Sequence, residues 1–238
     1  DCDWSSDVCS SDLQTFTHSF WMKRGLLGES LYQMILSTGS GGSNRDVFYF
    51  PGDSSQKLSY YTTAASLNNI VFQTNQVFRD ISAWYHIVLA VDTTQATASN
   101  RFKLYVNGLQ VTSFAIDNMS SISQNTNMNT NNTIEHDISR DQVNAALYFD
   151  GYLAEYNFID GQALAPSSFG STNSATGVWQ PAKYTGTYGT NGFYLPFTDN
   201  STTTSGSNVG IGKDFSGNGK DRKSTRLNSS HSQQSRMP

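Results

Sequence analysis

The strand-forming stretches of this sequence are short, and clusters of Gly, Asn, Ser, Thr or Pro separate them. In the first stretch Phe16, His18, Phe20 and Met22 alternate with other residues and share the face that we expect to point inward. The further stretches are 32–36, 47–50, 58–61, 69–73, 84–92, 101–106, 109–114, 134–139, 151–159 and 193–197. Many short strands at turn-rich spacing predict a single all-β, two-sheet antiparallel sandwich.

Turn residues indicate how some of these strands are connected. Asn107-Gly108 favours a type I′ hairpin, because both residues tolerate a positive φ. Residues 120–133 contain few apolar side chains and should form a loop. Pro166 and Gly170 enclose what we expect to be one helical turn. Because proline cannot donate a hydrogen bond, the last strand, which contains Pro196, should lie at a sheet edge.

The two ends of the chain resemble translated sequencing adapter. Residues 221–238 can be back-translated to a widely used library adapter, and its complement fits residues 1–13. Such artefacts are set aside before fold and function are argued. We therefore expect a domain at 14–200 that lacks its first strand, a linker at 201–220, and no convincing packing at either end.

Setting the ends aside changes the composition. Both cysteines, Cys2 and Cys9, are lost, so no disulfide or thiol argument is available. The interior keeps 14 acidic and 11 basic residues, which gives no electrostatic case for binding nucleic acid or a membrane surface. No apolar run approaches the roughly 20 residues needed to span a bilayer.

Three segments carry a family pattern. FTHSFWMK at 16–23 is similar to an opening strand, WYHIV at 84–88 with KLYVNG at 103–108 to a central strand pair, and FDGYLAE at 149–155 to a later strand. Together they resemble the concanavalin A-like, laminin-G-like jelly-roll superfamily. The resemblance implies a jelly-roll β-sandwich and a class that includes both lectins and glucanases.

Segments 148–164 and 177–189 resemble the version of this domain in structural proteins of tailed phages. That resemblance implies a location in the virion, other virion proteins as partners, and a glycan or host-surface polysaccharide as ligand. Our main hypothesis is a non-catalytic carbohydrate- or surface-binding module. The alternatives are a glycoside hydrolase with an unrecognised acid pair and a purely structural decoration domain.

Residues 135–140 invite comparison with the E-x-D-x-x-E strand of sandwich-fold glucanases. In those enzymes two carboxylates flank the glycosidic bond. Glu135 and Asp137 match the first two positions, but Arg140 stands at the third. Because the leaving oxygen then has no proton donor, we expect no hydrolysis through this motif.

The histidines and tryptophans of the first strands are expected to be structural. No H-x-H or H-x-x-E spacing surrounds His86, which we expect to bond across the sandwich, and His18 should be a satisfied core residue. Trp21 and Trp84 should pack, because burying a large aromatic side chain is strongly favourable.

No cofactor is expected, and calcium is the alternative that remains. Calcium takes six to eight oxygen ligands, and only Asp150 and Asp160 are candidates, without a D-x-D-x-D-G loop. The resemblance also argues against calcium, because Ala154 replaces the aspartate of the D-E pair seen in the family.

Sugar binding requires aromatic platforms together with Asn and backbone donors on loops. Residues of those types stand on the predicted strands 58–61 and on the predicted loops. The candidate ligand-binding residues are Tyr60, Tyr61, Asn44, Asn129 and Trp179.

Overall fold

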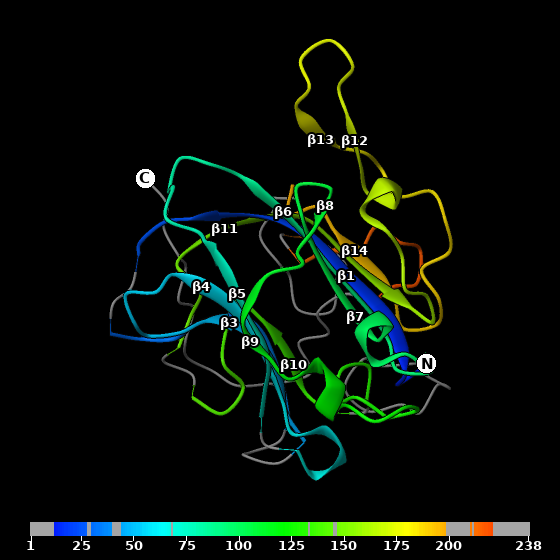
Figure 1. Ribbon diagram of the computed structural model, residues 1–238. Helices are drawn as coiled ribbons and strands as arrows, with labels where there is room; N and C mark the ends of the chain where they lie inside the picture. Colours follow the sequence, from blue (N-terminus) through cyan, green and yellow to red (C-terminus); the bar gives the residue numbers. More distant parts are fainter. Residues whose placement is uncertain are drawn as a thin grey trace, which may run out of the picture.

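The computed structural model describes residues 12–27, 30–39, 44–67, 69–132, 134–144, 147–198, 210 and 212–220. In these residues the chain forms two large antiparallel β-sheets packed face to face, with 3₁₀ turns as the only helical structure (Figure 1). The predicted all-β jelly-roll sandwich is therefore confirmed. No helix in the described ranges is long and apolar enough to cross a membrane.

Sheet A contains the first strand at its centre. Its order is β14 (Phe193–Leu195), β11 (Gly151–Asp160), β1 (Thr15–Arg24), β6 (Tyr85–Asp92), β7 (Phe102–Val106) and β8 (Leu109–Gln110). β14, which Pro196 follows directly, lies at the edge of sheet A, as predicted.

Sheet B is the second layer of the sandwich. Its order is β10 (His136–Ile138), β2 (Gln33–Thr38), β3 (Asp46–Phe50), β4 (Lys57–Thr62), β5 (Asn69–Val77) and β9 (Phe114–Asp117). The sequence did not predict the small hairpin of β12 (Gly170–Thr172) and β13 (Trp179–Pro181), which projects from the sandwich at the top of Figure 1.

Among the described residues, four 3₁₀ turns connect the strands. They are η1 (Ala64–Ser66), η2 (Ala98–Asn100), η3 (Met119–Ser121) and η4 (Pro166–Ser168). The last is the predicted helical turn, with Pro166 at its start and Gly170 after its end.

The core lies between the sheets and is rich in phenylalanine. The alternating residues of β1 all point into it, and Phe16, Phe20 and Met22 are fully buried. Phe20 stacks on Tyr156 of β11 with ring centroids 5.1 Å apart. Each such side chain contributes about 1.5–3 kcal/mol when it leaves water, so the alternation read from the sequence also locates the main source of stability.

The β7–β8 hairpin has the predicted turn. Asn107 and Gly108 have φ values of 49° and 82°, which the type I′ geometry requires. The prediction of one strand over 109–114 was wrong, because β8 ends at Gln110. Residues 111–113 instead carry the chain from sheet A to sheet B, where β9 begins.

Loop 120–133 is irregular, as predicted, yet much of it is buried. Asp46, at the start of β3, accepts hydrogen bonds from Asn129 Nδ2 (3.1 Å), the Thr130 amide (2.6 Å) and the Thr130 hydroxyl (3.0 Å). Thr62 Oγ1 donates a further bond of 2.5 Å. This carboxylate therefore fixes the loop against sheet B.

The predicted boundaries fare differently where the structure describes them. Residues 1–11, with both cysteines, 201–209 and 221–238 lie outside the described residues. Asp12 does pack, since its amide donates to Asp160 Oδ1 at 3.1 Å. Within the predicted linker, residues 212–220 do contact the sandwich, because Asp214 Oδ1 accepts the Tyr194 amide of β14 at 2.9 Å.

Candidate functional site

The adjacent candidates Tyr60 and Tyr61 lie on opposite faces of β4. Tyr60 is fully buried between the sheets, with its ring stacked on Phe72. It is a core residue and offers no surface to a ligand. Tyr61 lies on the outer face of sheet B and is half-buried, and Asn44 is exposed at the turn before β3 with φ 58°.

Two of the other predicted residues, Asn129 and Asp160, are occupied by the protein itself. Asn129 is buried against Asp46. Asp160 is also buried, and its carboxylate accepts bonds from Asn131 Nδ2 (2.6 Å) and the Asn191 amide (3.0 Å). Asp150 is exposed. Over the described ranges no three His, Cys, Asp or Glu side chains are arranged to hold a metal.

Trp179, predicted as a sugar platform, instead anchors the β12–β13 hairpin. Its indole Nε1–H donates to His86 Nδ1 at 2.9 Å. The His86 ring stacks between Trp21, at 5.0 Å, and Trp179, at 5.9 Å between centroids. His86 is therefore structural, but it lies on the outer face of sheet A and does not bond across the sandwich.

His86 also lies 3.0 Å from Ser19 Oγ, a spacing that a nucleophilic serine and its base would share. The Trp179 bond excludes that role. Because Nδ1 accepts a hydrogen bond from Trp179, the neutral ring carries its hydrogen on Nε2. His86 Nε2 therefore donates to the Ser19 hydroxyl. Burial lowers the pKa of His86 to about 4, which keeps the ring neutral at pH 7.

His18 is buried in the core, although its hydrogen bonding is incomplete. Its Nδ1 lies 3.1 Å from the Tyr156 hydroxyl, whereas Nε2 has no hydrogen-bond partner within the described residues. Burial, with the nearby His136, lowers the pKa of His18 to about 3. The ring is therefore neutral, as a core histidine should be.

The glucanase-like segment forms no pair of acids. Asp137 of β10 forms an ion pair with Arg140 at 3.7 Å, and Glu135 is exposed before the strand. Arg140, which stands where the motif has its last acid, thus lies beside Asp137, the second acid of the motif.

The outer face of sheet B carries a group of three tyrosines, which we call the tyrosine patch: Tyr32, Tyr49 and Tyr61. Tyr32 is 49% exposed, and its ring lies 5.7 Å from that of Tyr49. Tyr49 is buried beside Met34 and Val47, with Tyr61 packed against them. Burial, with the nearby Tyr32 and Tyr61, raises the pKa of Tyr49 to about 12.

Polar groups surround the tyrosine patch. Ser59 lies opposite Tyr49 on β4, and the Ser59 hydroxyl accepts a hydrogen bond from Gln73 Nε2 at 3.2 Å. Nearer the Tyr61 end, Arg45 forms an ion pair with Asp141, which also accepts the Ser37 hydroxyl at 3.2 Å. Ser59, Ser37 and Asp141 are themselves buried and hold the patch in place. The groups that a ligand can reach are the rings of Tyr32 and Tyr61, with half-buried Gln73 and Arg45 beside them.

Of this patch, the sequence predicted only Tyr61. Tyr49 was missed, although the alternation Val47, Tyr49 against Phe48, Phe50 in β3 could have placed it on the opposite face from the core. Tyr32 lies just before β2, and only the folded structure brings it next to Tyr49.

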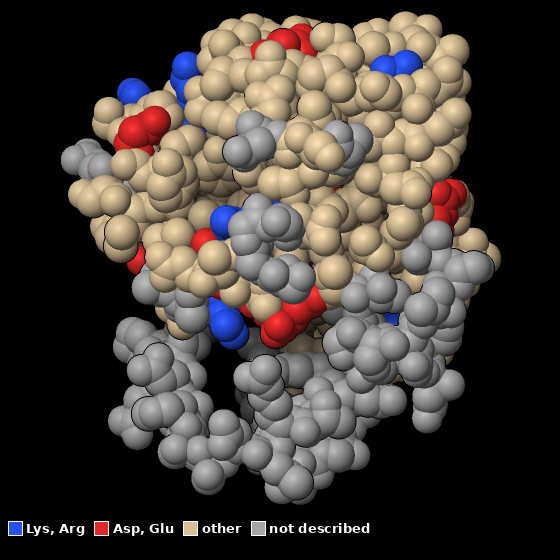
Figure 2. Space-filling model, turned by 90° about the horizontal axis from the view of Figure 1, so that it is seen from below, with Lys and Arg blue, Asp and Glu red and all other residues tan. Residues whose placement is uncertain are grey.

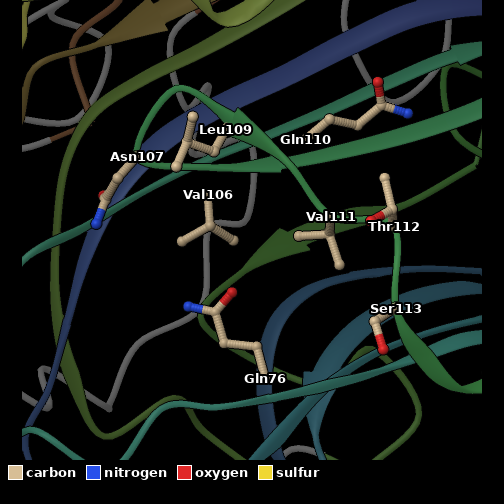
Figure 3. A pocket seen from close by; sticks show the side chains of 8 residues that line it. All are labelled: Gln76, Val106, Asn107, Leu109, Gln110, Val111, Thr112 and Ser113. Carbon is tan, nitrogen blue, oxygen red and sulfur yellow. The ribbon is translucent and has the colours of Figure 1, made fainter.

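A separate open hollow of about 360 Å³ lies beside β8 where the chain changes sheets (Figure 3). Its lining consists of Gln76, Val106, Asn107, Leu109, Gln110, Val111, Thr112 and Ser113. These side chains include no aromatic ring and no charged group. The hollow therefore lacks the stacking surface that the tyrosine patch provides.

The antiparallel two-sheet sandwich with crossover at β8–β9 defines a jelly-roll domain. The chain belongs to the concanavalin A-like lectin/glucanases superfamily, whose family model matches residues 5–168. No curated protein matches the sequence.

Several solved structures are similar to this chain. A putative carbohydrate binding protein from Bacteroides ovatus has 14% identity and a TM-score of 0.48, with 84% of this chain and 50% of that chain covered. The CBM40 of the Ruminococcus gnavus IT-sialidase has 15% identity, a TM-score of 0.42 and coverage of 65% and 80%. A SAP-like pentraxin from Limulus polyphemus has 14% identity, a TM-score of 0.42 and coverage of 64% and 66%.

Proposed function

We propose that this domain binds carbohydrate without catalysis, through the outer face of sheet B. The observation that carries the proposal is the tyrosine patch, in which three tyrosines from separate segments gather on one face beside Ser59 and Gln73. Sugar rings present apolar C–H faces to aromatic rings and hydroxyls to polar groups. The rings of Tyr32 and Tyr61 offer the first contact, and the half-buried side chains of Gln73 and Arg45 offer the second.

The charge distribution favours an uncharged or weakly charged ligand. In the view of Figure 2, Lys, Arg, Asp and Glu side chains are few and scattered among uncharged residues. Nucleic acid is held chiefly by clustered cations on its phosphates. A hydroxyl-rich polymer needs no such cluster, and a host-surface polysaccharide meets that description.

Binding to a glycan array, followed by calorimetry on each responding sugar, tests the proposal. Tyr61→Ala and Tyr32→Ala should each weaken binding at least tenfold, because each removes a stacking surface. Leu109→Ala is the matched control, since Leu109 is 76% exposed beside the hollow. Unchanged affinity in both tyrosine variants would overturn this site.

The absence of catalysis is part of the same proposal. Arg140 beside Asp137, and the proton on His86 Nε2, support it. We expect no release of reducing sugar from a polysaccharide panel. Release that Glu135→Gln abolishes would establish the hydrolase alternative.

We further propose that the domain belongs to a tailed-phage virion protein and acts there on the host surface. Support comes from the resemblance of segments 148–164 and 177–189 to phage structural proteins. Flanking genomic sequence with tail or capsid genes is the expected finding. Flat glycan arrays together with incorporation into virion-like particles would favour a purely structural decoration domain.

A further inference from the structure

A β-bulge interrupts the pairing of β1 with β11. Ser19 pairs with Asn157 and Trp21 with Ala154, so two residues of β11, Glu155 and Tyr156, stand opposite one residue of β1. Glu155 has φ 51°, a left-handed conformation that disfavours residues with a Cβ. Bulges of this kind re-aim side chains and are common beside functional sites.

The bulge places the Glu155 carboxylate among polar groups of sheet A. Tyr194 of β14 donates its hydroxyl to Glu155 Oε2 at 2.5 Å, and Asn157 Nδ2 donates to the Glu155 carbonyl at 2.9 Å. Within the described ranges Glu155 forms no ion pair. Its second carboxylate oxygen can therefore accept hydroxyl groups from a ligand.

Two large aromatic side chains are exposed further along the same sheet. Trp84 is 42% and Tyr152 46% exposed, with ring centroids 6.5 Å apart. The prediction that Trp84 is a packing residue was therefore wrong. Lys23, paired with Tyr152 across β1 and β11, places Nζ 5.9 Å from the centre of the Tyr152 ring.

Part of this outer face is covered by the chain itself. Val88 and Ile159 lie beneath Phe169 and Tyr184, which belong to the segment after β11. Tyr152 and Glu155 lie three positions apart on β11, about 10 Å at about 3.3 Å per residue. The half-buried carboxylate and the exposed aromatic pair therefore share one strip of this face, at the border of that segment.

We infer that this strip is a second carbohydrate-binding site, in which Trp84 and Tyr152 stack on sugar rings and Glu155 accepts sugar hydroxyls. The carboxylate argues against a phosphate-bearing ligand, which it would repel, and against a lipid surface, where an uncompensated charge is costly. The inference goes beyond the tyrosine patch, because it concerns the opposite sheet. Sites on both faces make one domain bivalent toward a polysaccharide.

Calorimetry and precipitation with soluble mannan, dextran and galactan test the second site. The wild-type chain should bind two sites per molecule and precipitate the responding polysaccharide. Trp84→Ala and Tyr152→Ala should each leave one site and abolish precipitation, and Tyr61→Ala should leave the other site. Val178→Ala is the control, since Val178 is 56% exposed on the β12–β13 hairpin.

Glu155→Gly separates binding from folding. Glycine accepts the left-handed backbone without strain, which offsets the loss of the Tyr194 hydrogen bond at a half-buried hydroxyl. The variant should therefore melt close to the wild type while its binding at this site falls at least tenfold. One site per molecule, lost in Tyr61→Ala and intact in Trp84→Ala and Glu155→Gly, would overturn the second site alone. No binding of any of the three polysaccharides or of an arrayed glycan would overturn both carbohydrate proposals.

Discussion

The Nε1–H group of Trp179 donates a hydrogen bond to Nδ1 of His86, at 2.9 Å, and thereby ties the β12–β13 hairpin to sheet A. A protonated imidazole has a hydrogen on both nitrogens and cannot accept this bond. The docking of the hairpin and the neutrality of His86 therefore depend on each other. Trp21 also stacks on the His86 ring, with centroids 5.0 Å apart.

The stability of the domain should fall as the pH decreases below neutrality. Burial lowers the pKa of His86 and His136 to about 4 from 6.5, so the unfolded chain binds protons more readily than the folded one. This stabilisation is complete above about pH 6.5 and is lost as the pH falls toward about 4. By pH 5 the free energy of unfolding should have fallen by about 2 kcal/mol per histidine.

Urea denaturation at pH 7.5 and pH 5 measures this dependence. His86→Gln should show a shallower loss than the wild type, because one of the titrating groups is gone. Equal unfolding free energies at the two pH values would contradict the neutral, buried state of these rings.

Trp179→Phe should destabilise the hairpin while keeping most of the aromatic stacking. The variant leaves His86 Nδ1 without its donor, at a cost of about 1–2 kcal/mol. Freed from that donor, His86 should titrate at a higher pH, which NMR of the imidazole protons can follow. A pKa that stays near 4 would mean that burial alone holds the ring neutral.

Local patterns were sufficient to predict most of the strands of the two large sheets and the main hairpin. Alternation in β1 and the Asn107-Gly108 turn depend on neighbours in the sequence, and both are confirmed. The site was harder. The apolar alternation of Leu58 and Tyr60 could have assigned Tyr60 to the core, whereas the burial of Asn129 depends on Asp46, 83 residues away. No local pattern contains such a contact.

Gly108→Ala tests the close contact beneath Trp179. A Cβ at Gly108 would lie 2.7 Å from the Trp179 ring, and φ is 82°. We expect a loss of about 2–3 kcal/mol, from steric displacement added to the backbone strain. Gly177→Ala is the matched control, because its φ is 70° but no atom lies within 4 Å of the added Cβ.

That control should lose only about 1 kcal/mol, the cost of the left-handed backbone. Thermal melts of the two variants isolate the steric part. If both variants melt at the same temperature, Trp179 does not pack on the turn in solution.

Replacing Asp46 should detach loop 120–133 from sheet B. Its carboxylate accepts four donors, from Thr62, Asn129 and the Thr130 amide and hydroxyl. Asp46→Ala leaves these buried donors unpaired, and we expect a loss of about 3 kcal/mol or more. Asp53→Asn is the control, since Asp53 is exposed and accepts one local bond from the Ser55 amide at 2.8 Å.

Hydrogen exchange distinguishes loss of the loop from general weakening. In Asp46→Ala the Thr130 amide should exchange much faster, while amides of β1 and β6 change only with global stability. Uniform acceleration across loop and strands would indicate that Asp46 supports the whole sandwich instead of anchoring this loop. Asp53→Asn should leave both groups of amides within about 0.5 kcal/mol of the wild type.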